Sequence, residues 1–288
     1  MITLKAPAKI NWSLYVLDRR ADGYHNILSL MQSVSLYDTL TFSHASSLVL
    51  DTDMQIPPNQ NLVMRAARAL QDATGTDGGA TISLTKEIPS GAGLGGGSSD
   101  AAYTLIGLNK LWQLGLELPR LREIGATLGS DVPFFLGSAA AVASSRGEVL
   151  CPEHLLPGLA LLIVKPEASI STAMAYKSVS ESRKPSGCSH DLTNHEEKLN
   201  NIKLIIGKLN SETIAPPYDL LHNDFERIAI EMHPVIGEIK RGLGRAGAEA
   251  ALLSGSGSAV FGLFVNREAA VKASALFSSY WNRVVETL

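Results

Sequence analysis

A glycine-rich segment between residues 89 and 100 restricts the possible folds of this chain more than any other feature. It consists of Pro-Ser-Gly-Ala-Gly-Leu-Gly-Gly-Gly-Ser-Ser-Asp, and an apolar helical pattern begins directly after it. A glycine loses much conformational entropy when it becomes ordered, so a chain rarely concentrates several of them in front of a helix. Such a loop provides bare backbone N–H groups and the positive end of a helix dipole. Both features are typical of a phosphate-binding site.

Two common phosphate-binding loops can be compared with this segment. A P-loop requires the pattern GxxxxGK[ST], and no lysine follows these glycines, so the P-loop is excluded. Gly91, Gly93 and Gly96 match the dinucleotide-binding pattern GxGxxG. That pattern normally opens a first βαβ unit after a hydrophobic strand, whereas here it follows residues 86–89, deep in the chain. The segment is therefore a phosphate loop of a third type, or a glycine loop that merely turns the chain.

Composition limits the class of protein. The chain has 288 residues, 45% of them hydrophobic and 18% charged, which is typical of a globular protein with room for two packed lobes. The formal net charge of −3 argues against a protein that binds nucleic acid. The apolar runs are too short to span a membrane, and the N-terminal residues show no signal peptide. Cys151 and Cys188 lack CxxC spacing, so neither a zinc site nor a disulfide framework is indicated. We expect a cytoplasmic protein that binds neither nucleic acid nor membranes.

Residue periodicity predicts strands and helices without steady βαβ alternation, which is typical of the α+β class. Strands are expected at residues 2–6, 10–17, 31–36, 39–43, 47–51, 81–85, 139–143, 148–150, 159–164 and 259–265. Helices are expected at 61–72, from 98–100 to 114, at 119–129 and at 222–242. In the third of these, Pro119 suits the first turn and Gly129 suits the end.

Residues 152–158 contain two prolines and a glycine and are the expected boundary between two domains. The predicted domains are residues 1–155 and 156–288. Residues 178–201 are polar and rich in Ser, Lys, Asn and Glu, which predicts a mobile loop or a solvated helix face and not an active centre.

The glycine-rich segment, together with the buried helix after it, resembles the nucleotide loop of the galactose, homoserine, mevalonate and phosphomevalonate (GHMP) kinase family. The resemblance continues in residues 6–11, 20–25, 61–62, 128–133, 223–226 and 253–257. It therefore spans nearly the whole chain. There are two departures: Ser145 stands where the family more usually has glycine, and Ser254 and Ser256 stand where it more usually has threonine. Both concern loop geometry and not the reaction.

The resemblance implies two α+β lobes, the N-terminal one similar to domain 2 of ribosomal protein S5 and the C-terminal one an α/β-plait. Within the family, residues 6–11 and 20–25 are most similar to kinases with a cytidine-containing acceptor. The implied reaction uses ATP and Mg²⁺ to phosphorylate the 2-hydroxyl of 4-diphosphocytidyl-2-C-methyl-D-erythritol, in the non-mevalonate route to isoprenoids. ATP and acceptor are expected to meet between the lobes. The alternatives are a homoserine or mevalonate type of GHMP kinase and a non-catalytic nucleotide-binding module.

The resemblance also assigns the residues that hold ATP. Those expected to wrap its phosphates are Pro89, Ser90, Gly91, Ala92, Gly93, Leu94, Gly95, Gly96, Gly97, Ser98 and Ser99. The two serine hydroxyls can reach phosphate oxygens or Mg²⁺, or simply cap the following helix. Asn61 is expected near the adenine, and it can equally serve as a helix N-cap.

Lys9 and Asp131 are the candidate catalytic residues. An ionised aspartate can accept the proton that the attacking hydroxyl loses, although an aspartate in Ser-Asp-x-Pro also commonly bonds its own backbone. Lys9 on its own resembles a solvated strand residue. The resemblance places it beside Asp131, where a cation keeps the carboxylate ionised and stabilises the transferred phosphoryl group. The presence of both residues argues against a non-catalytic module.

Tyr24 and His25 are the candidate readers of the cytosine base. An aromatic ring can stack on a pyrimidine, and a neighbouring imidazole can bond its edge, whereas the simpler interpretation is an exposed loop pair. By resemblance, Tyr176 supplies a second aromatic ring, and Thr172 and Asn11 supply polar contacts to the acceptor. Homoserine and mevalonate carry no base to stack, so this cluster argues against them as acceptors.

Overall fold

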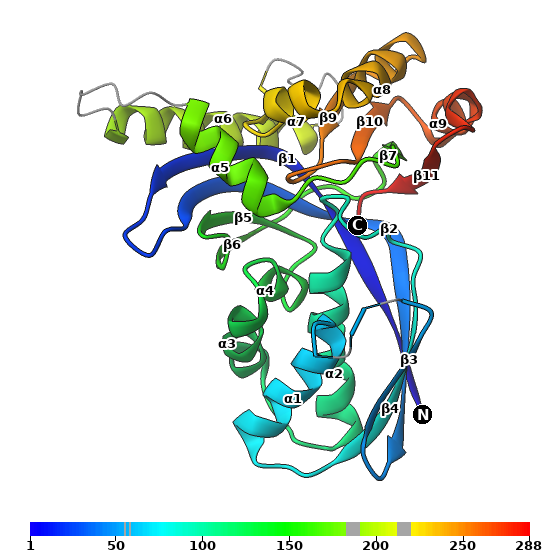
Figure 1. Cartoon of the computed structure of the whole chain (residues 1–288). Helices are drawn as coiled ribbons and strands as arrows, with labels where there is room; N and C mark the ends of the chain where they lie inside the picture. The colour runs from blue at the N-terminus through cyan, green and yellow to red at the C-terminus, as the bar shows by residue number, and fades with distance from the viewer. Residues whose placement is uncertain (55, 58, 183–190, 212–219) are drawn as a thin grey trace. The chain divides into compact units, whose positions relative to one another are not determined.

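The computed structural model describes residues 1–54, 56–57, 59–182, 191–211 and 220–288 (Figure 1). The chain divides into two compact units. The first unit consists of Met1–Ala8, Leu36–Ser90 and Gly95–Ala139, and the second of Lys9–Ser35, Gly91–Leu94 and Ala140–Leu288. Both units combine strands and helices, so the predicted α+β class is confirmed. The predicted domain boundary at residue 155 stays a prediction.

The first two strands are longer than the sequence predicted. β1 (Ile2–Arg19) continues through Pro7 without a break, and β2 (His25–Ala45) joins two predicted strands and also covers residues 25–30. The polar residues Lys9, Asn11 and Ser13 are buried in β1. In this strand, a polar side chain is therefore not a sign that the position faces solvent. Proline also tolerates an extended backbone wherever its missing N–H is not needed.

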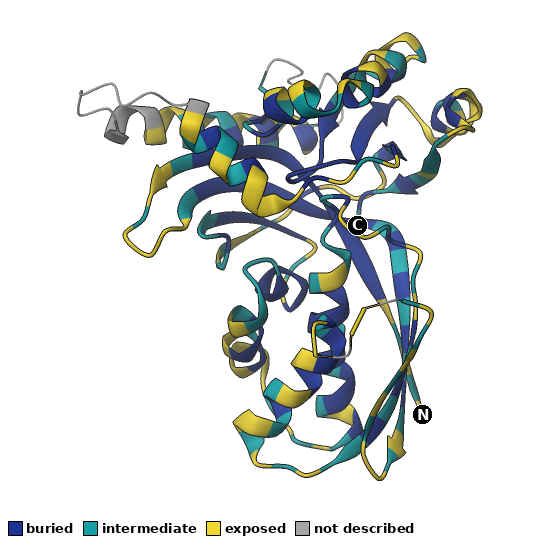
Figure 2. Cartoon of the chain, in the orientation of Figure 1, coloured by how far each residue is buried: buried dark blue, intermediate teal, exposed yellow. Residues whose placement is uncertain are grey.

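The first unit packs four helices with β3, β4 and parts of β1 and β2. The bounds are β3 (Leu48–Thr52), β4 (Gly79–Thr85), α1 (Leu62–Thr74), α2 (Gly96–Leu111), α3 (Leu118–Leu128) and α4 (Val132–Phe135). β4 pairs antiparallel with β2, with Thr39 opposite Thr85, and parallel with β3. Figure 2 shows α2 buried along most of its length. A Cβ atom on Gly107 would lie 2.4 Å from the ring of Phe42, so the helix packs directly on β2. The three helices predicted in this region are confirmed.

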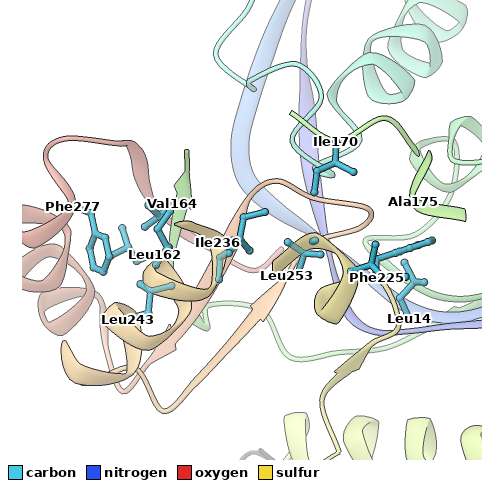
Figure 3. Close-up of a cluster of buried hydrophobic side chains, with 14 of the residues drawn as sticks. Leu14, Leu162, Val164, Ile170, Ala175, Phe225, Ile236, Leu243, Leu253 and Phe277 are labelled. Carbon is cyan, nitrogen blue, oxygen red and sulfur yellow. The ribbon is translucent and has the colours of Figure 1, made fainter. Parts of the chain in front are cut away.

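The second unit contains the other strands and helices. Their bounds are β5 (Ala140–Ser145), β6 (Val149–Glu153), β7 (Ala160–Lys165), β8 (His222–Asn223), β9 (Ala250–Leu253), β10 (Val260–Phe264), β11 (Trp281–Glu286), α5 (Thr172–Ser182), α6 (Asp191–Leu209), α7 (Glu226–Met232), α8 (Pro234–Arg245) and α9 (Arg267–Ser274). Four of these strands form an antiparallel sheet in the order β11-β7-β10-β9. Leu162, Val164, Leu243 and Phe277 gather in the core between this sheet and its helices (Figure 3).

One prediction in the second unit is wrong, and another is confirmed in part. The helix expected at 222–242 is instead the short strand β8 followed by α7 and α8, which separate at His233. Pro234 stands in the first turn of α8, where its missing N–H is tolerated, but its ring prevents continuation of the preceding helix. The segment 178–201 begins as the end of α5, where Val179 is buried, and its described remainder belongs to α6. Residues 195–201 of α6 are exposed or half-buried, as expected of a solvated helix face.

Among the described residues, no helix is both long enough and apolar enough to pass through a bilayer.

Five elements of the second unit were not predicted from the sequence: β8, β9, β11, α5 and α9. All but α9 contain few residues or mixed polarity, so local periodicity was too weak to reveal them.

Candidate active site

The glycine loop, residues 89–99, has a backbone that only glycine adopts readily. Gly91, Gly93 and Gly95 have φ values of 63°, 77° and 71°, in the left-handed region that disfavours residues with a Cβ. Gly95 is the N-cap of α2, which makes no side-chain capping bond in the described structure. The alternative that Ser98 or Ser99 caps α2 is therefore wrong, because α2 already begins at Gly96.

Ser99 lies in the first turn of α2 and is fully buried. Its Oγ has no hydrogen-bond partner among the described residues. A buried polar atom without a partner is unfavourable by about 1–3 kcal/mol, so such an atom calls for an explanation. A hydroxyl at a helix N-terminus that is not engaged in capping can donate a hydrogen bond to a bound anion or coordinate a bound cation through its oxygen. The chemistry of this position therefore fits a phosphate oxygen or a Mg²⁺ ion.

Lys9 is 4% exposed, and its hydrogen bonds include two within the second unit. Its Nζ donates to Asn11 Oδ1 at 2.7 Å, and its backbone N–H donates to the carbonyl of Leu94 in the glycine loop at 3.0 Å. Asn11 Oδ1 also accepts the N–H of Gly255 at 3.0 Å, and its Nδ2 donates to Ser29 Oγ at 2.8 Å. Asn11 thus links Lys9 to a second loop.

That second loop, residues 253–258, packs against the glycine loop. Ser254 Oγ donates to the carbonyl of Gly93 at 3.1 Å, and a Cβ on Gly93 would lie 1.9 Å from the carbonyl oxygen of Ser254. Asn223 donates from Nδ2 to the carbonyls of Leu253 and Gly255, both at 2.8 Å. The sequence identified the second loop, but it gave no sign that a distant asparagine holds it.

Asp131 belongs to the first unit, directly before α4. It is half-buried, and the four residues that follow, Val132 to Phe135, are buried. Its side chain does not cap α4. The carboxylate therefore lies at the edge of an apolar segment, which suits a proton acceptor.

His25, Tyr176 and Ser180 come together within the second unit. The rings of His25 and Tyr176 stack with centroids 5.4 Å apart and planes inclined by 14°. Tyr176 also meets Phe225 edge-to-face at 4.8 Å. Ser180 Oγ donates to the Tyr176 carbonyl at 2.9 Å and lies 2.7 Å from His25 Nε2. The serine hydroxyl thus links the His25 imidazole to the backbone carbonyl of Tyr176. Ser180 was missed because it lies in the segment predicted to be away from any site.

Tyr24 is 57% exposed, and the guanidinium of Arg146 covers one face of its ring at 5.2 Å. The turn that carries Arg146 includes Ser145, whose φ of 61° explains why glycine is more usual at this position. Ser145 Oγ accepts from Arg20 Nη1 at 2.9 Å and donates to Glu148 at 3.1 Å. These bonds connect the Tyr24 loop to the β5–β6 turn. Arg146 was not identified from the sequence.

The two remaining predicted residues have defined partners. Thr172, at the start of α5, shares a hydrogen bond of 3.0 Å with Ser256 of the second loop. Asn61 is the N-cap of α1 and accepts the N–H of Val63 at 2.9 Å, so its predicted capping role is confirmed. Its proximity to an adenine stays a prediction.

Comparisons with known proteins show the family of this chain. The family model for the GHMP kinases N terminal domain matches residues 61–144, and that for the GHMP kinases C terminal matches residues 205–282. A protein of Thermodesulfovibrio yellowstonii named 4-diphosphocytidyl-2-C-methyl-D-erythritol kinase is 49% identical, over 100% of this chain and 98% of that protein. One of Geobacter metallireducens with the same name is 43% identical, over 97% and 96%.

Solved structures are similar as well. A crystal structure of 4-(cytidine 5'-diphospho)-2C-methyl-D-erythritol kinase has a TM-score of 0.82 and 34% identity, covering 99% of both chains. Homoserine kinase from Cytophaga hutchinsonii has a TM-score of 0.75 at 18% identity, over 100% of this chain and 94% of that one, which shows a shared fold. The family match and the shared fold thus define a small-molecule kinase that uses ATP. The chain belongs to the GHMP kinase family, and the predicted family fold is confirmed.

Proposed function

We propose that this kinase transfers the γ-phosphoryl group of ATP to the 2-hydroxyl of 4-diphosphocytidyl-2-C-methyl-D-erythritol, in the cytoplasm, as a step of the non-mevalonate route to isoprenoids. The products are the 2-phosphate and ADP. The observation that carries the proposal is the name shared by relatives that are 49% and 43% identical over nearly their full length. The aromatic cluster around His25 and Tyr176 supports it, because the acceptor carries a planar base.

The glycine loop is proposed to bind the ATP phosphates through its backbone N–H groups, with the N-terminus of α2 pointing at the negative charge. The Ser99 hydroxyl is proposed to donate a hydrogen bond to a phosphate oxygen or to coordinate Mg²⁺. Either interaction would give a partner to its buried Oγ, which has none among the described residues. Mg²⁺ typically binds through one or two protein ligands together with substrate phosphates, and it neutralises charge on the phosphoryl group. Asn61 is proposed to lie near the adenine.

Asp131 is proposed to accept the proton of the acceptor's 2-hydroxyl while the oxygen of that hydroxyl forms a bond to the γ-phosphorus of ATP. The bond from that phosphorus to the β–γ bridging oxygen breaks, and ADP leaves. Lys9 is proposed to keep Asp131 ionised and to stabilise the negative charge on the transferred group. Asn11 supports this role, since it fixes the position of the Lys9 ammonium.

The cytosine ring is proposed to stack on the face of Tyr24 opposite Arg146. His25 and Tyr176 are proposed to form the adjoining part of the base site, and Thr172 a polar contact with the acceptor. Asn11 stays a predicted contact as well, although its oxygen already accepts two bonds within the protein.

Release of ADP, measured with one acceptor at a time, tests the proposal. The acceptors are 4-diphosphocytidyl-2-C-methyl-D-erythritol, mevalonate, homoserine and galactose. We expect turnover with the first alone. Turnover only with mevalonate or homoserine would assign the chain to another GHMP activity, and ATP binding without turnover on any acceptor would indicate a nucleotide-binding module.

A further inference from the structure

Three charged residues of the first unit form a buried cluster beside the glycine loop. Asp38 of β2 is fully buried, Asp100 of α2 is 3% exposed, and the Lys86 side chain is 12% exposed. Lys86 Nζ donates to Asp100 Oδ2 at 2.7 Å and also to Asp38 Oδ2. A charged group is buried only where partners compensate for lost hydration, so this arrangement must be maintained by its geometry.

The cluster holds the chain on the entry side of the glycine loop. Asp38 Oδ1 accepts the backbone N–H groups of Glu87 and Ile88, at 2.7 and 2.8 Å. These are the last two N–H groups before Pro89, which has none to donate. Residues 86–88 are therefore fixed to β2 by one carboxylate.

The same cluster holds the chain on the exit side of the loop. Asp100 lies in the second turn of α2, so its bond to Lys86 joins two residues that flank the loop. Gly96, the first residue of α2, lies close by: a Cβ there would be 3.3 Å from Lys86 Nζ and 2.8 Å from the Ile88 side chain. Both ends of a loop that is mostly glycine are thus attached to one ionic cluster.

We propose that Asp38, Lys86 and Asp100 form a clamp that fixes both ends of the glycine loop and thereby preorganises it for ATP. A glycine-rich segment has much conformational entropy to lose, and a loop that is ordered in advance loses less of it on binding. Lys86 is shared by two carboxylates, so it acts as an anchor and not as a phosphate ligand. The three are positioning residues. The inference rests on the proposed binding of ATP by this loop.

Asp38→Asn tests the clamp, because it removes the ion pair and keeps the size of the side chain. We expect the KM for ATP to rise about tenfold, with kcat and the KM for the acceptor changed less than about twofold. Asp51→Asn in β3 is the matched control, since the one side-chain bond of Asp51 among the described residues is an exposed one that it accepts from Ser83 Oγ at 3.2 Å. Its KM for ATP should equal that of the wild type.

The same variant separates an anchor from a phosphate ligand. If Lys86 bound phosphate directly, Asp38→Asn would release its ammonium, and the affinity for ATP would stay the same or increase. A folded Asp38→Asn protein with unchanged or improved affinity therefore overturns the proposal. If Asp38→Asn does not fold, Asp100→Asn replaces it, with a smaller expected rise of about threefold, because Asp38 accepts two backbone N–H groups in addition to the Lys86 ammonium. An unchanged KM in folded Asp100→Asn then overturns the clamp.

A double-mutant cycle with Lys86→Met completes the test. A clamp requires the double variant Asp38→Asn/Lys86→Met to bind ATP about as well as the weaker single variant, whereas additive losses contradict it. Calorimetric titration of ATP without acceptor gives the binding constant independently of turnover. If the wild type itself does not bind ATP, the proposed function fails and not merely the clamp.

Discussion

The side-chain oxygen of Asn11 accepts a hydrogen bond from the Lys9 ammonium at 2.7 Å. The same oxygen accepts the N–H of Gly255 at 3.0 Å, so a single amide sets both the direction of the lysine and the position of the second loop. The bonds are buried, where a fixed geometry is maintained more strictly than at the surface.

Asn11→Ala should therefore lower kcat by about one to two orders of magnitude, because the Lys9 ammonium loses its orientation. Unfolding in urea should show a loss of about 1–3 kcal/mol from the unsatisfied groups. Asn11→Asp, which keeps an acceptor oxygen for both donors, serves as the comparison and should retain more activity. Equal activity in the two variants would contradict an orienting role.

Lys9→Ala and Asp131→Asn should each lose most of kcat, by about 10²–10⁴-fold, because proton acceptance and charge stabilisation act on the transferred group. Binding of ATP, measured by calorimetry, should change little in either variant. Near-normal turnover in one of them would remove that residue from the proposed chemistry.

Tyr24→Ala should raise the KM for the cytidine-containing acceptor by about tenfold or more, because stacking on an aromatic ring contributes about 1–3 kcal/mol per base. The KM for ATP should be unaffected. Tyr24→Phe keeps the ring and should behave like the wild type in a steady-state assay with both substrates varied. If Tyr24→Ala weakened both substrates equally, stacking of the base on this ring would be the wrong explanation.

Gly91→Ala and Gly93→Ala separate backbone strain from steric exclusion. Both residues have positive φ, but a Cβ on Gly91 would meet its nearest atom at 3.8 Å and one on Gly93 at 1.9 Å. Gly91→Ala should therefore lower the free energy of unfolding only by the cost of a positive φ for alanine, about 1–2 kcal/mol. Gly93→Ala should be clearly less stable in urea unfolding, because the second loop must move. Equal losses would show that the contact between the loops is dispensable.

The features predicted correctly from the sequence are local ones. The glycine loop and the helices of the first unit depend on neighbouring residues, and capping by Asn61 follows from residue type alone. The break before Pro234 is also a local signal, because a proline ring ends a helix at the preceding residue. In contrast, Lys9 was difficult to place because its strand buries several polar residues that resemble solvent-facing ones.

The features that could not be predicted depend on contacts between distant residues. The bond between Asn223 and the second loop joins residues about thirty positions apart, and Asp38 and Lys86 are 48 apart. Each of these residues taken alone is an ordinary surface type, and only the fold shows that it is buried with partners. Resemblance to a family identified the reaction more readily than it identified the residues that hold the loops.

Burial, opposed by the Lys86 charge and reinforced by the Asp38 charge, raises the pKa of Asp100 to about 7 from its ordinary 3.8. At this carboxyl the folded state therefore binds more protons than the unfolded state between about pH 4 and 7, and the contribution of Asp100 to stability falls as pH rises through this window. Asp100→Asn removes the titrating group, so its stability relative to the wild type should increase from pH 5 to pH 8. This shift of the Asp100 pKa corresponds to a difference in unfolding free energy of a few kcal/mol at most, at about 1.4 kcal/mol per pH unit. Urea unfolding of both proteins at the two pH values measures it, and parallel pH dependence in the two proteins would show that Asp100 is already ionised at pH 5.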